Sequence, residues 1–148
     1  MIRVIDASVA VKWFVDGDWA QSEDHVDHAL ALLLACRDGQ VDFLQPPHFV
    51  AEVAAVLARG KPQAATEDIQ NLLDMDFQVV DALPIYENAI DLSRQLKHHL
   101  FDTLYHALAL ATPGVSLITA DRRYYNKAHH LGQILWLPEQ SFGNQERL

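Results

Sequence analysis

The strongest constraint on the fold is a regular alternation of strand and helix patterns along the sequence. Short apolar runs typical of buried strands alternate with segments in which apolar residues recur at helical spacing. Strands that are joined through helices run parallel, because each helical crossover returns the chain to the same edge of the sheet. We therefore predict an α/β fold with a central parallel sheet, whose strands lie at residues 2–6, 41–45, 77–81, 116–119 and 134–137.

The segments between these strands carry helix start and stop signals. Ser22 is a candidate N-cap of a long helix that stops at Asp38-Gly39. The helix predicted at 102–112 is apolar on nearly every side, which indicates that it is buried in the core. The remaining predicted helices span about 48–59, a segment beginning at Thr66, 84 to about 98, and 122–130.

Length and composition favour a single soluble domain. The 148-residue chain is long enough to bury roughly two thirds of the surface of its unfolded form, so we expect one domain over residues 1–148. We expect a cytoplasmic protein without membrane association, since no uncharged apolar run approaches the roughly 20 residues of a membrane span. Cys36 is the only cysteine, which excludes an intrachain disulfide, and its apolar helical neighbours predict a small core residue.

Four acidic residues lie where a strand pattern gives way to a helix pattern. Asp6 follows the first strand, Asp121 follows the fourth, and Asp102 opens the buried helix. Glu52 lies on or beside the apolar face of the helix after the second strand. In open parallel sheets these positions meet at the carboxyl edge, where α/β proteins place their active sites. We expect the four carboxylates to converge there, although Asp6, Asp102 and Asp121 could also be simple helix N-caps.

The clustering of near-buried carboxylates predicts a divalent cation. No Lys or Arg neighbour is obvious, and a cation relieves the mutual repulsion of such carboxylates. Carboxylate oxygens are hard ligands that suit Mg²⁺ or Mn²⁺, whereas zinc sites recruit His or Cys at short spacing. An alternative transition-metal set is His98, Asp102 and His106, which would share a face if the helix extended back to His98. We place His98 instead in the loop before that helix.

The formal net charge of −9 argues against a broad cationic surface for nucleic acid, so any such contact must be local. The basic residues that are closest in sequence to a predicted ligand are Arg122, Arg123 and Lys127. Arg123 and Lys127 share a helical face, so we expect these two to contact phosphate, with Arg94 and Lys97 as the alternative patch.

Four short motifs carry these acids and occur in a fixed order. They are VIDAS at 4–8, PHFVAEV at 47–53, FDTLYHALA at 101–109 and ITADRRYYN at 118–126. Together they resemble the motifs of PIN-domain ribonucleases, and most closely those of the VapC-type toxins of bacterial toxin–antitoxin pairs. The resemblance spans nearly the whole chain, and one departure is Thr103, where the family usually has alanine.

The resemblance implies a three-layer α/β/α sandwich and a metal-dependent endoribonuclease that hydrolyses RNA. By position, Asp6, Glu52, Asp102 and Asp121 would hold Mg²⁺ (or Mn²⁺), and Ser8 and Thr119 would support them through hydrogen bonds. From their closeness in sequence to Asp121, rather than from the resemblance, we expect Arg122, Arg123 and Lys127 to contact the RNA. The implied protein partners are a cognate antitoxin and a second copy of the chain in a homodimer.

Two other functions are compatible with parts of the sequence. Haloacid-dehalogenase-like phosphatases also place an Asp after their first strand, but they need a second acid two residues later, where this chain has Ser8. A catalytically silent PIN-like binding module would not need the complete set of acids. Metal-dependent RNA cleavage would indicate the nuclease, turnover of p-nitrophenyl phosphate the phosphatase, and neither activity the binding module.

Overall fold

The computed structural model describes residues 1–142 and contains a five-stranded parallel sheet. The strand order is β3-β2-β1-β4-β5, so the first strand of the chain lies at the centre. This arrangement confirms the predicted α/β fold with a central parallel sheet. The strands fall within the predicted segments and are β1 (Ile2–Ile5), β2 (Asp42–Gln45), β3 (Gln78–Val79), β4 (Ser116–Thr119) and β5 (Ile134–Trp136). Residues 143–148 of the predicted domain lie outside the described residues.

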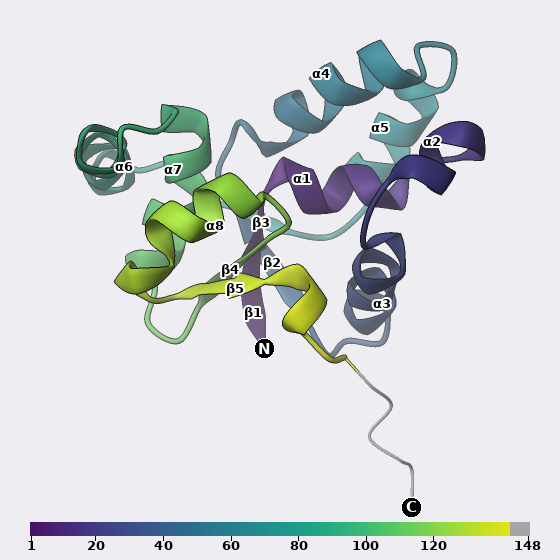
Figure 1. The fold of residues 1–148 in the computed structure, drawn as a ribbon. Helices are drawn as coiled ribbons and strands as arrows, with labels where there is room; N and C mark the ends of the chain where they lie inside the picture. Colours follow the sequence, from purple (N-terminus) through teal and green to yellow (C-terminus); the bar gives the residue numbers. More distant parts are fainter. Residues whose placement is uncertain (143–148) are drawn as a thin grey trace, which may run out of the picture.

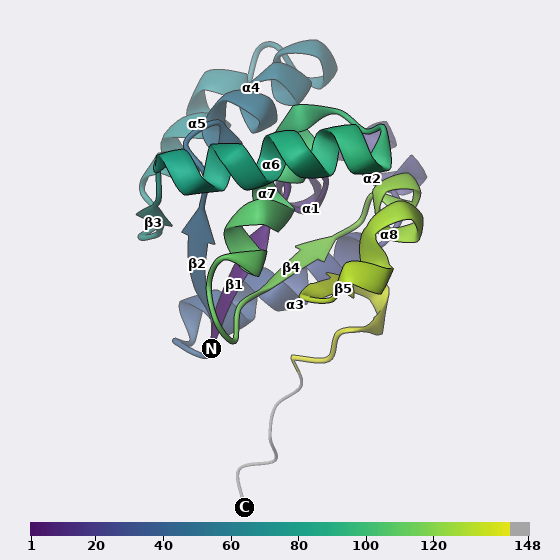
Figure 2. The ribbon, with the colours of Figure 1, turned by 90° about the vertical axis from the view of Figure 1, so that its left-hand side faces the viewer.

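Helices cover both faces of the sheet and complete a three-layer sandwich (Figure 1). Figure 2 shows α6 and α7 on the near side of the sheet and α3 behind it. The helices are α1 (Ala7–Ala10), α2 (Gly17–Ser22), α3 (Val26–Arg37), α4 (Phe49–Gly60), α5 (Ala65–Leu73), α6 (Leu83–Leu96), α7 (Leu100–Leu110) and α8 (Arg122–Ala128), with short 3₁₀ turns at Val11–Trp13, His129–Leu131 and Leu137–Glu139. None of the helices within residues 1–142 is long and apolar enough to span a membrane.

Helix α7 is the buried helix that the sequence predicts. It packs against β1 and β4, and every side chain from Thr103 to Ala109 is buried. The Thr103 hydroxyl donates a hydrogen bond to the carbonyl of Ala89 at 2.9 Å, so this departure from the family's alanine leaves no unpaired polar group. The helix begins at Leu100 with His99 as its N-cap. The interpretation of Asp102 as an N-cap is therefore wrong, since Asp102 lies in the first turn.

Two further expectations about the amino-terminal half need correction. Ser22 does not cap the long helix: it ends α2, and α3 begins at Val26 after His25, whose φ of 63° interrupts the helical path. Trp19 of this short helix α2 packs so closely on Gly60 that a Cβ atom there would lie 2.2 Å from the indole ring. Cys36 is half-buried and packs against the edge of the core rather than inside it.

A buried side chain, Gln45, completes the pairing of β2 with the central strand β1. The register of β1 with β2 pairs Ile2 with Asp42 and Arg3 with Phe43. Beyond this point the fully buried Gln45 amide accepts a hydrogen bond from the Ile5 N–H at 2.9 Å and donates one to the Ile5 carbonyl at 2.7 Å. Both backbone groups of Ile5 are thereby satisfied, and the chain is fixed directly before Asp6.

Replacing this amide should destabilise the fold. We expect Gln45→Leu to lower the free energy of unfolding by about 2–4 kcal/mol, because it leaves two buried backbone groups of Ile5 unpaired. Urea denaturation followed by circular dichroism measures the change. Gln78→Leu on the exposed edge strand β3 is the control, with an expected change within about 0.5 kcal/mol. Equal stability of the two variants would show that the Gln45 amide is dispensable.

Candidate active site

A cleft of about 640 Å³ lies at the carboxyl edge of the sheet, and its walls include all four acids selected from the sequence. Each acid comes from a different part of the chain. Asp6 follows the central strand β1, Glu52 lies on α4, Asp102 lies on α7, and Asp121 joins β4 to α8. The parallel sheet thus brings together four residues that are spread over more than a hundred positions.

Asp6 is the most deeply buried of these acids, with only 7% of its surface exposed. Its carboxylate accepts hydrogen bonds from the hydroxyls of Ser8 and Thr119. Burial raises the pKa of Asp6 to about 7; the two hydroxyls oppose this shift, while the negative charges of Asp102 and Asp121 add to it. Within residues 1–142 no Lys or Arg forms an ion pair with Asp6.

The hydroxyls of Ser8 and Thr119 also tie Asp6 to the turn between β4 and α8. Ser8 Oγ accepts a hydrogen bond from the Ala120 N–H at 3.1 Å, and Thr119 Oγ1 accepts one from the Asp121 N–H at 3.0 Å. Each hydroxyl therefore donates to the Asp6 carboxylate and accepts from the backbone. This network fixes the position of Asp6 relative to Asp121.

Glu52 is half-buried and has its own partners. Its Oε1 accepts a hydrogen bond from the Tyr105 hydroxyl at 2.7 Å and lies 3.1 Å from His48 Nε2. Burial alone would raise the pKa of Glu52, but His48 and Tyr105 outweigh it and hold the pKa below its usual value. Asp6 and Glu52 line the same cleft, yet the pKa of Asp6 is raised and that of Glu52 is lowered.

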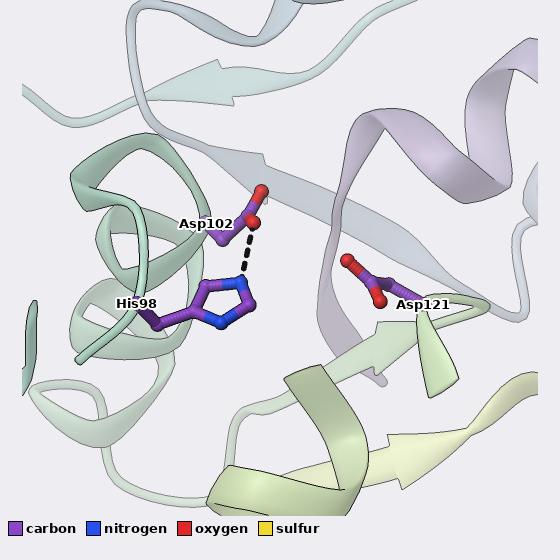
Figure 3. A group of neighbouring side chains, drawn as sticks. All are labelled: His98, Asp102 and Asp121. Atoms are coloured by element: carbon purple, nitrogen blue, oxygen red, sulfur yellow. Dashed lines mark hydrogen bonds and ion pairs between the residues drawn. The ribbon is translucent and has the colours of Figure 1, made fainter. Parts of the chain in front are cut away.

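Asp102, Asp121 and the loop residue His98 form a compact group (Figure 3). His98 Nε2 lies 2.7 Å from Asp102 Oδ2. Burial raises the pKa of Asp102; the hydrogen bond to His98 opposes the shift, and the charges of Asp121 and Glu52 strengthen it. Asp121 does cap α8, because its Oδ1 accepts a hydrogen bond from the Tyr124 N–H at 3.2 Å. Capping and a place in the cleft are therefore compatible for this residue.

The alternative metal set of His98, Asp102 and His106 does not form. His106 is fully buried in α7, and its ring nitrogens lie 2.8 Å from the Tyr124 hydroxyl and 2.8 Å from the carbonyl of Gly132. Both nitrogens are thus engaged away from Asp102. His98 lies in the loop between α6 and α7, as the sequence predicts.

The cleft also contains a lysine that the sequence analysis missed. Lys12 is only 6% exposed; its ammonium donates to the carbonyl of Asp24 at 2.5 Å and lies 3.6 Å from Glu23. Lys12 follows Ser8 by four residues and is on the same face of the helical segment. This spacing was visible in the sequence and could have indicated a cation at the wall of the cleft.

The three basic residues near Asp121 differ in position. Arg122 lines the cleft, and its guanidinium carbon lies 4.3 Å from the ring centroid of Trp136, a distance typical of a cation–π contact. Arg123 is exposed on α8 and does not contribute to the cleft wall. The Lys127 ammonium donates to the carbonyl of Lys97 at 3.1 Å, in the loop between α6 and α7.

The cleft residues fit a divalent cation. Four carboxylates supply hard oxygen donors, and among residues 1–142 the nearly buried Asp6 is compensated only by hydroxyl hydrogen bonds. Burial, together with the smaller effect of the neighbouring carboxylates, raises the pKa values of Asp6 and Asp102, and a bound cation would offset both effects.

The fold and the acidic cleft define an α/β protein with a candidate metal site at the carboxyl edge of its sheet. Comparison with protein families shows that residues 3–130 match the model of the PIN domain, and the chain belongs to the PIN-domain family. Among curated protein sequences there is no match.

Two solved structures share the fold at low sequence identity. The crystal structure of PAE2754 from Pyrobaculum aerophilum has a TM-score of 0.59 and 17% identity, over 86% of this chain and 87% of that chain. The 2.2 Å structure of VapBC-1 from nontypeable Haemophilus influenzae has a TM-score of 0.61 and 16% identity, over 94% of this chain and 100% of that chain.

The raised pKa of Asp6 predicts a pH-dependent stability of the metal-free protein. The folded state keeps the Asp6 proton up to a pH of about 7, whereas the unfolded state loses it near pH 4. The folded state therefore binds more protons between these values, so this residue makes stability fall as the pH rises through that range. Asp6→Asn removes the titration. In EDTA we expect its melting temperature to exceed that of the wild type more at pH 8 than at pH 5.

Thermal melts at both pH values measure this difference. Asp91→Asn makes the same change of charge on the exposed face of α6 and is the control, with a melting temperature expected within about 2 °C of the wild type. If the melting temperatures of Asp6→Asn and the wild type differed by the same amount at both pH values, the raised pKa of Asp6 would be contradicted.

Proposed function

We propose that this PIN-domain protein is a metal-dependent endoribonuclease and the toxin component of a toxin–antitoxin pair. The observation that carries the proposal is the meeting of Asp6, Glu52, Asp102 and Asp121 in one cleft of a chain that belongs to the PIN family. The VapC-like motifs and the shared fold with VapBC-1 support the toxin assignment. We further propose that residues 1–148 form one domain that acts in the cytoplasm.

The four carboxylates would hold Mg²⁺ or Mn²⁺. Such an ion, when bound, lowers the pKa of a water ligand and offsets the charge that develops on the phosphate. Ser8 and Thr119 keep the Asp6 carboxylate oriented, and Tyr105 and His48 do the same for Glu52. Ion binding would displace the proton that Asp6 retains near neutral pH. No side chain is needed as the nucleophile, because water attacks the phosphorus.

Exposed apolar side chains support the proposed protein partners. Leu30 and Leu34 project from α3 with 39% and 52% exposure, and Leu83 and Ile90 on α6 are exposed by 68% and 48%. Leu30 and Leu34 are one turn apart on α3 and therefore share a face, and contiguous apolar surface of this kind often marks protein–protein contacts. We propose that such surfaces bind a cognate antitoxin and a second copy of the chain. An antitoxin Arg or Lys that reaches the acidic cleft would find carboxylates able to pair with it.

Removing one carboxylate should abolish RNA hydrolysis. We expect Asp102→Asn to lower divalent-dependent cleavage by at least about 100-fold, because it removes a charged ligand while it keeps the shape of the side chain. A fluorescent single-stranded RNA substrate at saturating Mg²⁺ and Mn²⁺ measures the rate. Asp91→Asn is the control that should cleave at the wild-type rate. Wild-type cleavage by Asp102→Asn, or turnover of p-nitrophenyl phosphate alone, would contradict the nuclease assignment.

The same variant tests the toxin assignment in cells. Expression of the wild type should stop bacterial growth, and expression of Asp102→Asn should not. Co-expression of the small protein encoded beside this gene should restore growth to cells that carry the wild type. If the wild-type protein cleaves RNA but does not slow growth on expression, the nuclease assignment stands and the toxin assignment is wrong.

The position of Arg122 makes it the strongest candidate for contact with RNA phosphate. The sequence favours Arg123 and Lys127 over Arg122 for RNA contact, but of these three residues only Arg122 lines the cleft, and Trp136 holds its guanidinium. We propose that Arg122 contributes more to RNA affinity than the other two residues. Its charge acts close to the cleft acids, where a phosphate would otherwise be repelled.

Replacing Arg122 should weaken RNA binding and its salt dependence. On single-stranded RNA, each phosphate that a basic side chain neutralises adds about 0.7 to the slope of log affinity against log salt, so we expect Arg122→Ala to reduce the slope by that amount. Arg123→Ala, next in sequence but outside the cleft wall, is the matched control and should keep the wild-type slope. Fluorescence anisotropy with a non-cleavable RNA analogue at saturating Mn²⁺ measures both, so that the metal ligands stay intact. If Arg123→Ala reduced the slope and Arg122→Ala did not, phosphate binding would belong to the outer face of α8.

A further inference from the structure

His98 places a nitrogen atom inside an otherwise acidic group. One ring nitrogen of His98 and one carboxylate oxygen each of Asp102 and Asp121 all lie within 4.8 Å of one another, and it is Nε2 that contacts Asp102 (Figure 3). The imidazole is only 8% exposed, whereas the Asp102 side chain is 33% exposed. A nearly buried ring therefore faces two carboxylates at the side of the cleft.

The loop that carries His98 fixes the ring from outside the acidic group. The His98 carbonyl accepts a hydrogen bond from Ser93 Oγ at 2.6 Å, and the His98 N–H donates to the Ser93 carbonyl at 3.1 Å. Lys97 has a positive φ of 50°, and its carbonyl accepts from Lys127. The ring packs against Tyr124 at a centroid distance of 5.0 Å. The position of the imidazole thus does not depend on Asp102 alone.

The spacing of the three atoms is close to that of ligands around one ion. Ligands at about 2.1 Å from an octahedral ion lie about 3 Å apart when adjacent and about 4.2 Å apart when opposite. His98 Nε2 and Asp102 Oδ2 are 2.7 Å apart, and no distance within the group exceeds 4.8 Å. Side-chain movements of less than about 1 Å would bring all three atoms into coordination distance of one ion.

We propose that His98 Nε2 coordinates the divalent cation together with Asp102 and Asp121, so that the site binds Mn²⁺ in preference to Mg²⁺. Imidazole nitrogen suits first-row transition metals, whereas Mg²⁺ strongly prefers oxygen ligands. The proposal deepens the proposed function, on which it rests for the use of the cleft as a metal site. It adds a nitrogen ligand to the carboxylates that the motifs supply.

A purely positioning role for His98 predicts different behaviour. If its ring only donated a hydrogen bond to Asp102, its loss would weaken Mg²⁺ and Mn²⁺ binding to a similar extent, and no nitrogen would lie on the metal. A ligand role predicts a selective loss of Mn²⁺ affinity and a nitrogen that is detectable at the ion. These two readouts separate the roles without any measurement of RNA cleavage.

The experiment uses the full chain after removal of metal, with Mn²⁺ and Mg²⁺ as separate probes. Calorimetry should show Mn²⁺ affinity reduced by about tenfold or more in His98→Gln, with Mg²⁺ affinity changed by less than about twofold. Pulsed electron paramagnetic resonance should detect ¹⁴N coupling to Mn²⁺ in the wild type and lose it in His98→Gln. His130→Gln, an exposed histidine outside the cleft, is the control and should keep the coupling. His98→Ala tests whether any effect of Gln comes from its own amide.

Three outcomes would overturn the proposal: no ¹⁴N coupling in the wild type, equal weakening of both ions, or no divalent binding at all. RNA cleavage without nitrogen coupling would leave the proposed function intact and refute the role of His98. Nitrogen coupling that depends on His98 in a protein that does not cleave RNA would refute the nuclease and support the metal ligand.

Discussion

The carboxylate of Asp6, held almost out of solvent at the end of the central strand, is the constraint around which the cleft is built. Its charged form receives hydrogen bonds from Ser8 and Thr119 but has no ion-pair partner among the described residues, and burial dominates its raised pKa. Such a group is tolerated in a folded protein when hydrogen bonds or a cation compensate its charge, or when it keeps its proton. The hydroxyls that bind Asp6 and a cation bound there would act at the same edge of the sheet, where three other acids already lie.

The fold distributes the compensation unequally among the four acids. Glu52 has Tyr105 and His48, and Asp102 has His98, whereas Asp121 uses one oxygen to cap α8. Two of the acids therefore have a histidine four residues earlier in the chain. His48 precedes Glu52 at regular helical spacing at the start of α4, and His98 precedes Asp102 from the loop before α7. The result is a cleft in which neighbouring carboxylates differ in pKa, as groups at catalytic sites commonly do.

Periodicity and motif position were sufficient to predict the strands, the buried helix α7 and the convergence of the acids, because each rests on local patterning and on the geometry of parallel sheets. The contacts that refine the site depend on long-range packing. Gln45 reads as an ordinary strand end, yet its amide replaces backbone pairing with Ile5. The choice of Arg122 over Arg123 at the cleft depends on Trp136, fourteen positions later in the sequence than Arg122. Ser22 had the right chemistry for a cap, but it ends α2, and α3 begins only at Val26, after the left-handed residue His25.

The net charge of −9 and the acidic cleft together constrain how an RNA strand could be held. Without a cation, the cleft carboxylates repel phosphate, and Lys12 cannot offset them fully because its ammonium is engaged by Asp24 and Glu23. Arg122 supplies one positive charge at the wall. Under the proposed function, a divalent ion would remove part of the local negative charge and supply a cation that phosphate can contact, so substrate binding and catalysis would depend on the same event. Affinity for RNA would then follow occupancy of the metal site more than the number of surface cations.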